Sequence, residues 1–254
     1  MGKVSALVGF GLKDEAALAR LSKELAEDAN VKHSYLRDHP TYNLWFTYKA
    51  GSREELLRRV SELASRFRVR EYVVLESKRT YKLSVKYELF RGVSWSKPGV
   101  APESPPTVED LGVDRRALRL LSDLPLTRRP YREAGAAAGL DEATLLGLVK
   151  ELIAKGVILD YGAVLDGQKA GFAFNAMVTL SGGAATCEWV ALNVPEASHV
   201  VLREAVEGEW PYDAYMVVHG VSRDVVEACV SHVVRTLGAE DYRKLYSVGC
   251  LKSG

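Results

Sequence analysis

A histidine and an arginine four residues apart occur twice in the chain, and each pair is followed by an aromatic segment. The first set is His33 and Arg37 followed by residues 42–46, and the second is His199 and Arg203 followed by residues 210–215. Imidazole titrates near neutral pH, and guanidinium binds carboxylates through two parallel hydrogen bonds. Aromatic rings beside them suit a planar partner. The repetition indicates a duplicated unit that binds a flat, anionic ligand.

Ordinary structural roles are the alternatives at these positions. His33 and His199 could be structural histidines beside a strand. Arg37 and Arg203 could form surface ion pairs, which contribute little stability. Trp45 alternates with other apolar residues and is equally consistent with core packing.

The composition indicates a globular protein that can bury more than one core. The chain has 254 residues, 47% of them hydrophobic, and a formal net charge of +1. This charge argues against a chain that binds nucleic acid over its whole surface. No apolar run is long enough for a membrane span and the N-terminus lacks a signal-peptide core, so we expect a cytoplasmic protein. The widely spaced Cys187, Cys229 and Cys250 indicate neither a disulfide framework nor a metal cluster.

Apolar periodicity predicts the same order of elements at both ends of the chain. The first part has predicted strands over 4–10, 33–36, 42–48 and 69–75 and helices over 14–27 and 53–67. The second has strands over 171–180, 199–204, 213–218 and 242–248 and helices over 185–192 and 223–237. The order β-α-β-β-α-β is that of the ferredoxin-like fold. Alternation over 79–89 predicts one further strand.

The middle of the chain has a different pattern. A proline-rich composition predicts a linker over 91–112. Short helices are predicted over 116–122, 131–138 and 141–155, the last with Asp141 as N-cap and Gly156 as C-cap, which describes a helix-turn-helix. We therefore predict an α+β protein in which ferredoxin-like domains at 1–90 and 166–254 flank a helix-turn-helix domain at 113–165.

Residues 138–165 resemble the Lrp/AsnC family, in which a helix-turn-helix precedes a ferredoxin-like ligand-binding domain. The paired motifs resemble more specifically the sirohaem decarboxylases and the related d1-type haem biosynthesis proteins. These carry His-x-x-x-Arg followed by Tyr-Asn-Leu-Trp-Phe in one unit, and Trp-Pro-Tyr followed by His-Gly in the other. The matching residues are His33, Arg37, Tyr42, Asn43, Leu44, Trp45 and Phe46, then His199, Arg203, Trp210, Pro211, Tyr212, His219 and Gly220.

The resemblance implies a carbon-carbon lyase (EC 4.1.1.-) that removes acetate carboxylates from sirohaem to give didecarboxysirohaem, in haem or d1-type haem biosynthesis. It implies no cofactor, because the iron tetrapyrrole is the substrate. Loss of carbon dioxide from a pyrrole acetate leaves a carbon that must be protonated, so His33, His199 and His219 are the predicted proton donors. An alternative is that His33 or His199 ligates the substrate iron. No metal site made by the protein itself is expected.

The resemblance also implies which residues hold the carboxylated macrocycle between the two ferredoxin-like domains. A basic segment of the family matches Ser77 to Lys82, whereas Ser247 to Lys252 keeps only the serine and the last lysine. The predicted substrate-binding residues are Arg37, Arg203, Tyr42, Asn43, Trp45, Arg79, Lys82, Trp210 and Tyr212. A second copy of the chain or a second decarboxylase subunit is the expected protein partner.

A DNA-binding regulator of the Lrp/AsnC type is the main alternative, supported by the predicted helix-turn-helix. The third predicted helix argues against it, because residues 141–155 contain three acids, two lysines and no arginine. A helix in the major groove usually offers Arg, Lys, Asn or Gln to bases and phosphates. We therefore expect no DNA binding. A non-catalytic tetrapyrrole-binding protein is a further alternative that only an assay separates.

Overall fold

The computed structural model describes residues 4–163 and 165–252, and the predicted α+β class is confirmed. The chain divides into two compact units. We call residues 4–100 together with 165–252 the barrel unit, and residues 101–163 the helical unit.

The predicted β-α-β-β-α-β order is confirmed in both halves of the barrel unit. The first half contains β1 (Val4–Phe10), α1 (Glu15–Glu27), β2 (Val31–Arg37), β3 (Leu44–Ala50), α2 (Arg53–Arg66) and β4 (Tyr72–Leu83). The second contains β7 (Phe174–Leu180), α6 (Gly183–Asn193), β8 (Ala197–Glu207), β9 (Ala214–Gly220), α7 (Arg223–Leu237) and β10 (Tyr242–Lys252).

The strand predicted over 79–89 is confirmed only in part, because it is not one separate strand. Its first part continues β4 to Leu83, because this stretch pairs with β8 of the other half. Its last part belongs to a short hairpin of β5 (Tyr87–Glu88) and β6 (Val93–Ser94), whose second strand pairs with β9 at Gly220.

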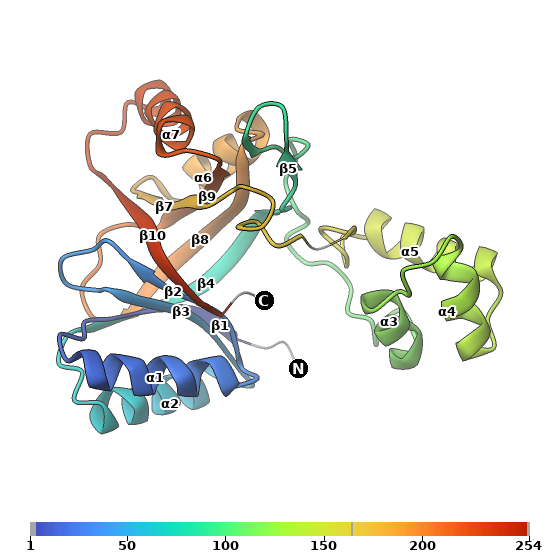
Figure 1. The fold of residues 1–254 in the computed structure, drawn as a ribbon, viewed down its shortest axis with the longest axis horizontal. Coiled ribbons are helices and arrows are strands. Elements are labelled where there is room, and N and C mark those ends of the chain that lie inside the picture. The colour runs from blue at the N-terminus through green and yellow to red at the C-terminus, as the bar shows by residue number, and fades with distance from the viewer. Residues whose placement is uncertain (1–3, 164, 253–254) are drawn as a thin grey trace. The chain divides into compact units, whose positions relative to one another are not determined.

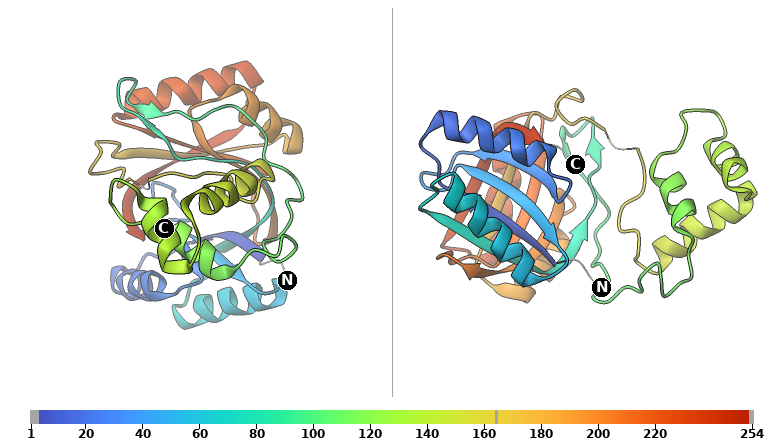
Figure 2. Two further views of the ribbon diagram at one scale, coloured as in Figure 1. Left: turned by 90° about the vertical axis from the view of Figure 1, so that its right-hand side faces the viewer. Right: turned by 90° about the horizontal axis from the view of Figure 1, so that it is seen from below.

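The strands of the two halves join at both edges and form a closed barrel. β4 pairs with β8, β10 pairs with β2, and β8 also pairs with β9, which gives the antiparallel ring β9-β7-β10-β2-β3-β1-β4-β8. Helices α1 and α2 cover the outside of one half, and α6 and α7 cover the other (Figures 1 and 2). Closure of the ring leaves no long unpaired edge between the halves.

Strand alternation divides the apolar residues between the outside and the inside of the barrel. On β1, Ala6, Val8 and Phe10 belong to the core beneath α1 and α2. Leu7 points the other way and belongs to an interior cluster with Trp45 and residues of the second half. The second half has a matching outer core beneath α6 and α7.

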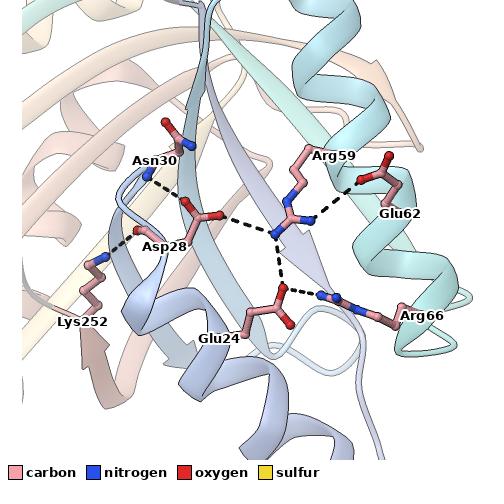
Figure 3. Close-up of polar contacts among 7 residues, drawn as sticks. All are labelled: Glu24, Asp28, Asn30, Arg59, Glu62, Arg66 and Lys252. Atoms are coloured by element: carbon pink, nitrogen blue, oxygen red, sulfur yellow. Dashed lines mark hydrogen bonds and ion pairs between the residues drawn. The ribbon is translucent and has the colours of Figure 1, made fainter.

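Each half also binds a helix end of the other half through a lysine. Lys252 Nζ at the end of β10 donates to Asp28 O at the C-cap of α1 (2.7 Å), and Figure 3 shows this bond beside ion pairs that join α1 to α2. In the same way Lys82 Nζ on β4 donates to Val194 O at the C-cap of α6 (3.1 Å). A cation at a helix C-terminus is favourable because it meets unpaired carbonyls.

The helical unit contains α3 (Arg115–Ser122), α4 (Pro130–Ala138) and α5 (Glu142–Ala154) around a small apolar core. Gly139 is left-handed (φ 72°) in the turn before α5. Asp141 is the N-cap as predicted and accepts from Thr144 N (2.8 Å). The predicted C-cap was placed one residue late, since Lys155 is the C-cap and Gly156 follows it with φ 69°. Among the described helices, none has the length and apolarity needed to cross a membrane.

Gly208, between β8 and β9, offers a test of how tightly the barrel closes. Its φ is +77°, and a Cβ there would lie 2.4 Å from the backbone oxygen of Tyr72. We expect Gly208→Ala to lower the free energy of unfolding by about 1–3 kcal/mol. The measurement is urea unfolding followed by tryptophan fluorescence, since all four tryptophans lie in the barrel unit. Gly99→Ala is the control, because Gly99 has nothing within 4 Å of an added Cβ. Equal stability of the two variants would contradict the prediction.

Candidate active site

A single cavity inside the barrel brings both repeated motifs together. Its volume is about 120 Å³, and its lining includes His33, Arg37, Asn175, His199, Arg203 and His219. The duplicated motifs therefore line one shared cavity rather than two separate ones.

The four-residue spacing places histidine and arginine on the same face of a strand. On β2, His33, Tyr35 and Arg37 line the cavity, whereas Leu36 packs against the outer core. On β8, His199 and Arg203 line the same cavity, and the intervening Leu202 packs outward. Alternate residues of a strand point to the same side, so the two strands present matching sets.

The two guanidinium groups are held by groups from the opposite half. Arg37 Nη1 donates to Leu245 O (2.7 Å) and lies 3.5 Å from Asn175 Oδ1. Arg203 Nη1 donates to Ser77 Oγ (2.6 Å) and lies 3.4 Å from Leu75 O. These contacts reach from β2 to β10 and β7, and from β8 to β4.

Neither guanidinium forms an ion pair within residues 4–163 and 165–252, and the Nε of each lacks a hydrogen bond there. Arg37 is buried, with 7% of its surface exposed, and Arg203 is half-buried. Burial lowers the pKa of each to about 10, so both stay charged at neutral pH. A buried cation is costly unless an anion compensates it. The cavity is therefore prepared for a ligand with negative groups.

The three histidines of the cavity are neutral at pH 7. Burial, reinforced by the neighbouring histidines and Arg203, lowers the pKa of His199 to about 3. Burial, with Arg37 and His33 nearby, lowers the pKa of His219 to about 4. Burial and the nearby lysines 49 and 32 also lower the pKa of His33. In the part of the chain that the structure describes, no group of three side chains is arranged to hold a metal ion.

Ser198 fixes which nitrogen of His199 carries the proton. Its hydroxyl donates to Val217 O (3.0 Å), and its oxygen lies 2.9 Å from His199 Nδ1. A hydroxyl has one proton to donate, so with that proton on Val217 O the assigned tautomer of His199 has Nδ1 as the donor in the second contact. Nε2 of the neutral ring is then the unprotonated nitrogen. The residue before His33 is Lys32, not a serine, so the two motif histidines differ in the side chain that precedes them.

Most of the predicted aromatic residues gather at one end of the barrel instead of lining the cavity. Here the β2–β3 and β8–β9 connections bring together an aromatic cluster of His39, Tyr42, Trp45, Trp210 and Tyr212. The Trp45 and Trp210 ring centroids are 5.4 Å apart. Of these side chains only Trp45 also lines the cavity. Trp45 is fully buried, so it serves core packing as well.

Three other predicted binding residues lie outside the cavity lining. The amide of Asn43 exchanges hydrogen bonds with the backbone of Leu12 (3.0 and 2.8 Å). The Arg79 guanidinium lies over the Tyr81 ring, 4.3 Å from its centroid. Lys82 is buried against the end of α6, where burial lowers its pKa to about 8.

Sequence reasoning missed Tyr35, Asn175 and Ser198. Tyr35 was detectable, since it lies between His33 and Arg37 on the same strand face, and burial raises its pKa to about 12. Asn175 Oδ1 accepts from Ser247 Oγ (2.8 Å) and depends on how β7 and β10 pair. No local signal in the sequence indicates that role.

Two family models match the chain. The model for the AsnC-like ligand binding domain matches residues 1–82 and 169–252, and the model for the siroheme decarboxylase NirDL-like HTH domain matches residues 114–158. The chain is thus a protein of the AsnC-like ligand-binding class, with two such regions on either side of a helix-turn-helix.

Two curated relatives indicate the family within this class. The chain is 32% identical to the siroheme decarboxylase beta subunit of Oleidesulfovibrio alaskensis over 55% of this chain and 90% of that protein. It is 28% identical to the siroheme decarboxylase of Hydrogenobacter thermophilus over 97% of this chain and 74% of that protein. The chain belongs to the sirohaem decarboxylase family.

Solved structures show the same fold. The crystal structure of the siroheme decarboxylase NirDL aligns with a TM-score of 0.61 at 24% identity, covering 99% of this chain and 73% of that chain. A second NirDL crystal structure, in complex with an iron-uroporphyrin III analogue, aligns with a TM-score of 0.59 at 23% identity.

The lowered histidine pKa values predict a dependence of stability on pH. The unfolded chain protonates these imidazoles near pH 6.5, whereas the folded chain resists protonation down to about pH 3 at His199 and about pH 4 at His219. Stability is therefore complete above pH 6.5 and falls as the pH drops below it, by up to about 1.4 kcal/mol per pH unit for each histidine. We expect His199→Gln to make the free energy of unfolding, measured between pH 7 and 5, less steep in pH. An unchanged slope would show that His199 is not held neutral.

Proposed function

We propose that the chain is a sirohaem decarboxylase, a carbon-carbon lyase (EC 4.1.1.-) that converts acetate side chains of sirohaem to methyl groups and yields didecarboxysirohaem for haem or d1-type haem synthesis. The observation that carries this proposal is the pair of guanidinium groups that face one cavity without an anionic partner among the described residues. Sirohaem carries several carboxylates around a flat ring and can offer one to each guanidinium. Three histidines in the same cavity are available for proton transfer.

Arg37 and Arg203 would bind substrate carboxylates. Each is already oriented by a carbonyl or hydroxyl from the opposite half, so little reorganisation is needed when the anion arrives. A carboxylate near the apolar side chains of Leu7, Met177 and Val217 would lose much of its hydration. Poor solvation of the departing carboxylate favours loss of neutral carbon dioxide.

The histidines would supply the proton after the substrate has bound. In decarboxylation the bond between the methylene carbon and the carboxylate breaks, carbon dioxide leaves, and the electron pair stays on the methylene carbon and the pyrrole ring. That carbon takes a proton and becomes a methyl group, so no oxidant or reductant is consumed and we propose no cofactor. Substrate carboxylates raise the pKa of neighbouring imidazoles, which turns neutral His33, His199 or His219 into an acid. The unprotonated Nε2 of His199 is alternatively suited to the substrate iron.

The cavity must enlarge to admit a tetrapyrrole. Its volume of about 120 Å³ is well below the roughly 300–1,000 Å³ of pockets that hold drug-sized ligands. Tyr87 of the β5–β6 hairpin packs on His219 (5.8 Å between centroids) and on Phe172 (4.5 Å). We propose that the rings of Tyr87 and Phe172 move aside when the macrocycle enters. It would enter at the end of the barrel that holds His33, His199 and His219, here called the histidine end, while the aromatic cluster keeps the other end closed.

The proposal includes a protein partner but no DNA. Several relatives are named as subunits of sirohaem decarboxylases, so we propose a second copy or a second decarboxylase subunit as the partner, in the cytoplasm. On α5, Glu142 pairs with Arg129 and Glu151 with Lys155. These pairs leave few free cations on that helix for phosphates.

Anaerobic incubation with sirohaem, followed by mass analysis, tests the function. We expect two successive losses of carbon dioxide with the wild type. His199→Ala should slow the reaction by about 10²- to 10⁴-fold, the usual effect of losing a general acid. Arg203→Met should weaken substrate binding by at least about tenfold, since hydrogen bonds to charged groups contribute about 1.5–3 kcal/mol. Arg58→Met, on the exposed face of α2, is the control with the same loss of charge.

Binding of sirohaem without loss of mass would contradict the lyase and favour a tetrapyrrole carrier. Wild-type rates and affinities in both cavity variants would show that the reaction takes place elsewhere.

A further inference from the structure

A second and larger cavity lies on the outside of the barrel unit. It has a volume of about 820 Å³ and lies between the connection that precedes α1 and the segment that links α2 to β4. Its lining shares no residue with the interior cavity. We call it the outer cleft.

The outer cleft is strongly basic. Its cationic lining residues are Lys13, Arg20, Arg66, Arg68 and Arg70, against the two acids Asp14 and Glu71. The carboxylate of Asp14 is already engaged, since it caps α1 by accepting from Ala16 N (2.9 Å) and Ala17 N (3.2 Å). This charge excess is local, because the whole chain has a net charge of only +1.

Most of these cations have no anion of their own. Arg66 pairs with Glu24, as Figure 3 shows, and lies over the Phe67 ring at 5.1 Å. Within the described ranges 4–163 and 165–252, Lys13, Arg20, Arg68 and Arg70 form no ion pair. Four unpaired cations around one hollow repel each other unless an anion binds between them.

Arg68 occupies a backbone conformation that disfavours it. It is the non-glycine residue with positive φ (55°) among the described residues, and it lies four positions before β4. In the second half the residue four positions before β10 is Gly238, with φ 61°. A side chain in the left-handed region costs roughly 1–2 kcal/mol, whereas glycine has no such cost. The first half thus has a guanidinium at a turn where the second half has the residue that the turn prefers.

The surrounding segments differ between the halves in the same way. After α2 the chain reads Phe67-Arg-Val-Arg-Glu71, whereas after α7 it reads Gly238-Ala-Glu-Asp241. The connection before α1 spans residues 11–14 and includes Lys13, whereas the connection before α6 spans only 181–182 and has no cation. The basic outer cleft is therefore a property of the first half alone and does not follow from the repeated fold.

We propose that the outer cleft is a second binding site, for a small polyanion with several carboxylate or phosphate groups. Its volume is within the range of roughly 300–1,000 Å³ that is typical of small-molecule sites. The planar guanidinium of arginine binds both carboxylate and phosphate through paired hydrogen bonds. Backbone hydrogen bonds hold the segments that line the outer cleft, because Gly11 N donates to Glu71 O (2.9 Å) and the amide of Asn43 bonds the backbone of Leu12. This gives Asn43 a role outside the barrel interior.

Calorimetric titration with two probes, iron-uroporphyrin and inorganic tripolyphosphate, tests the proposal. The variants are Arg68→Gly, Arg70→Ala and the two combined. We expect each substitution to weaken binding in the outer cleft by about tenfold, the loss of one charge-assisted contact, and added salt to weaken it further. Arg68→Gly should have a melting temperature no lower than the wild type, because glycine suits the left-handed turn.

Two controls separate the outer cleft from the barrel interior. Arg235→Ala removes an exposed cation from the second half and should leave binding unchanged. Arg203→Met changes the interior cavity and should leave the affinity of the outer cleft for both probes unchanged. Failure of this proposal is therefore distinct from failure of the proposed decarboxylation. Weaker binding of only one probe in the double variant would identify the ligand as a polycarboxylate or a phosphate compound. The proposal would be overturned if the double variant bound both probes as tightly as the wild type does. It would also be overturned if neither probe bound outside the barrel interior.

Discussion

Closure of the barrel across the two halves is the constraint on which the candidate site depends. Arg203 comes from the second half, but the hydroxyl and carbonyl that orient it come from β4 of the first. Arg37 comes from the first half, and its carbonyl acceptor lies on β10 of the second. The lysine contacts to the ends of α1 and α6 also cross between the halves, one in each direction. Neither half alone could build the cavity, because each supplies cations that the other positions.

The electrostatics of the cavity follow from this enclosure. Burial lowers the pKa of the two guanidinium groups only to about 10, so they stay charged, whereas it lowers the pKa of His199 and His219 far enough to leave these imidazoles neutral. A ligand with carboxylates would relieve the uncompensated positive charge and raise the basicity of the imidazoles in one step. Binding and proton transfer would then be linked, since the substrate would create the acid that its own decarboxylation needs.

The sequence was sufficient for the order of the elements in both ferredoxin-like halves and for the residue types that carry chemistry. Apolar periodicity predicted both ferredoxin-like halves, but the strand predicted over 33–36 stopped before Arg37, so the strand face shared by His33 and Arg37 comes from the structure. The sequence pattern could not show that the Lys82 ammonium donates to the carbonyl of Val194, or that the Asn43 amide binds the backbone of Leu12. Both contacts depend on tertiary packing between segments far apart in the chain. The resemblance suggested substrate binding for these residues, whereas their positions stabilise the barrel and the outer cleft.

A crystal structure of this chain with iron-uroporphyrin would test most directly whether the paired guanidinium groups bind a carboxylated tetrapyrrole. The geometry predicts the macrocycle at the histidine end of the barrel, with one carboxylate within hydrogen-bonding distance of Arg37, another within reach of Arg203, and Tyr87 moved away from His219. A complex in which the porphyrin occupies only the outer cleft, or leaves both buried arginines without an anion, would contradict this assignment of the active site.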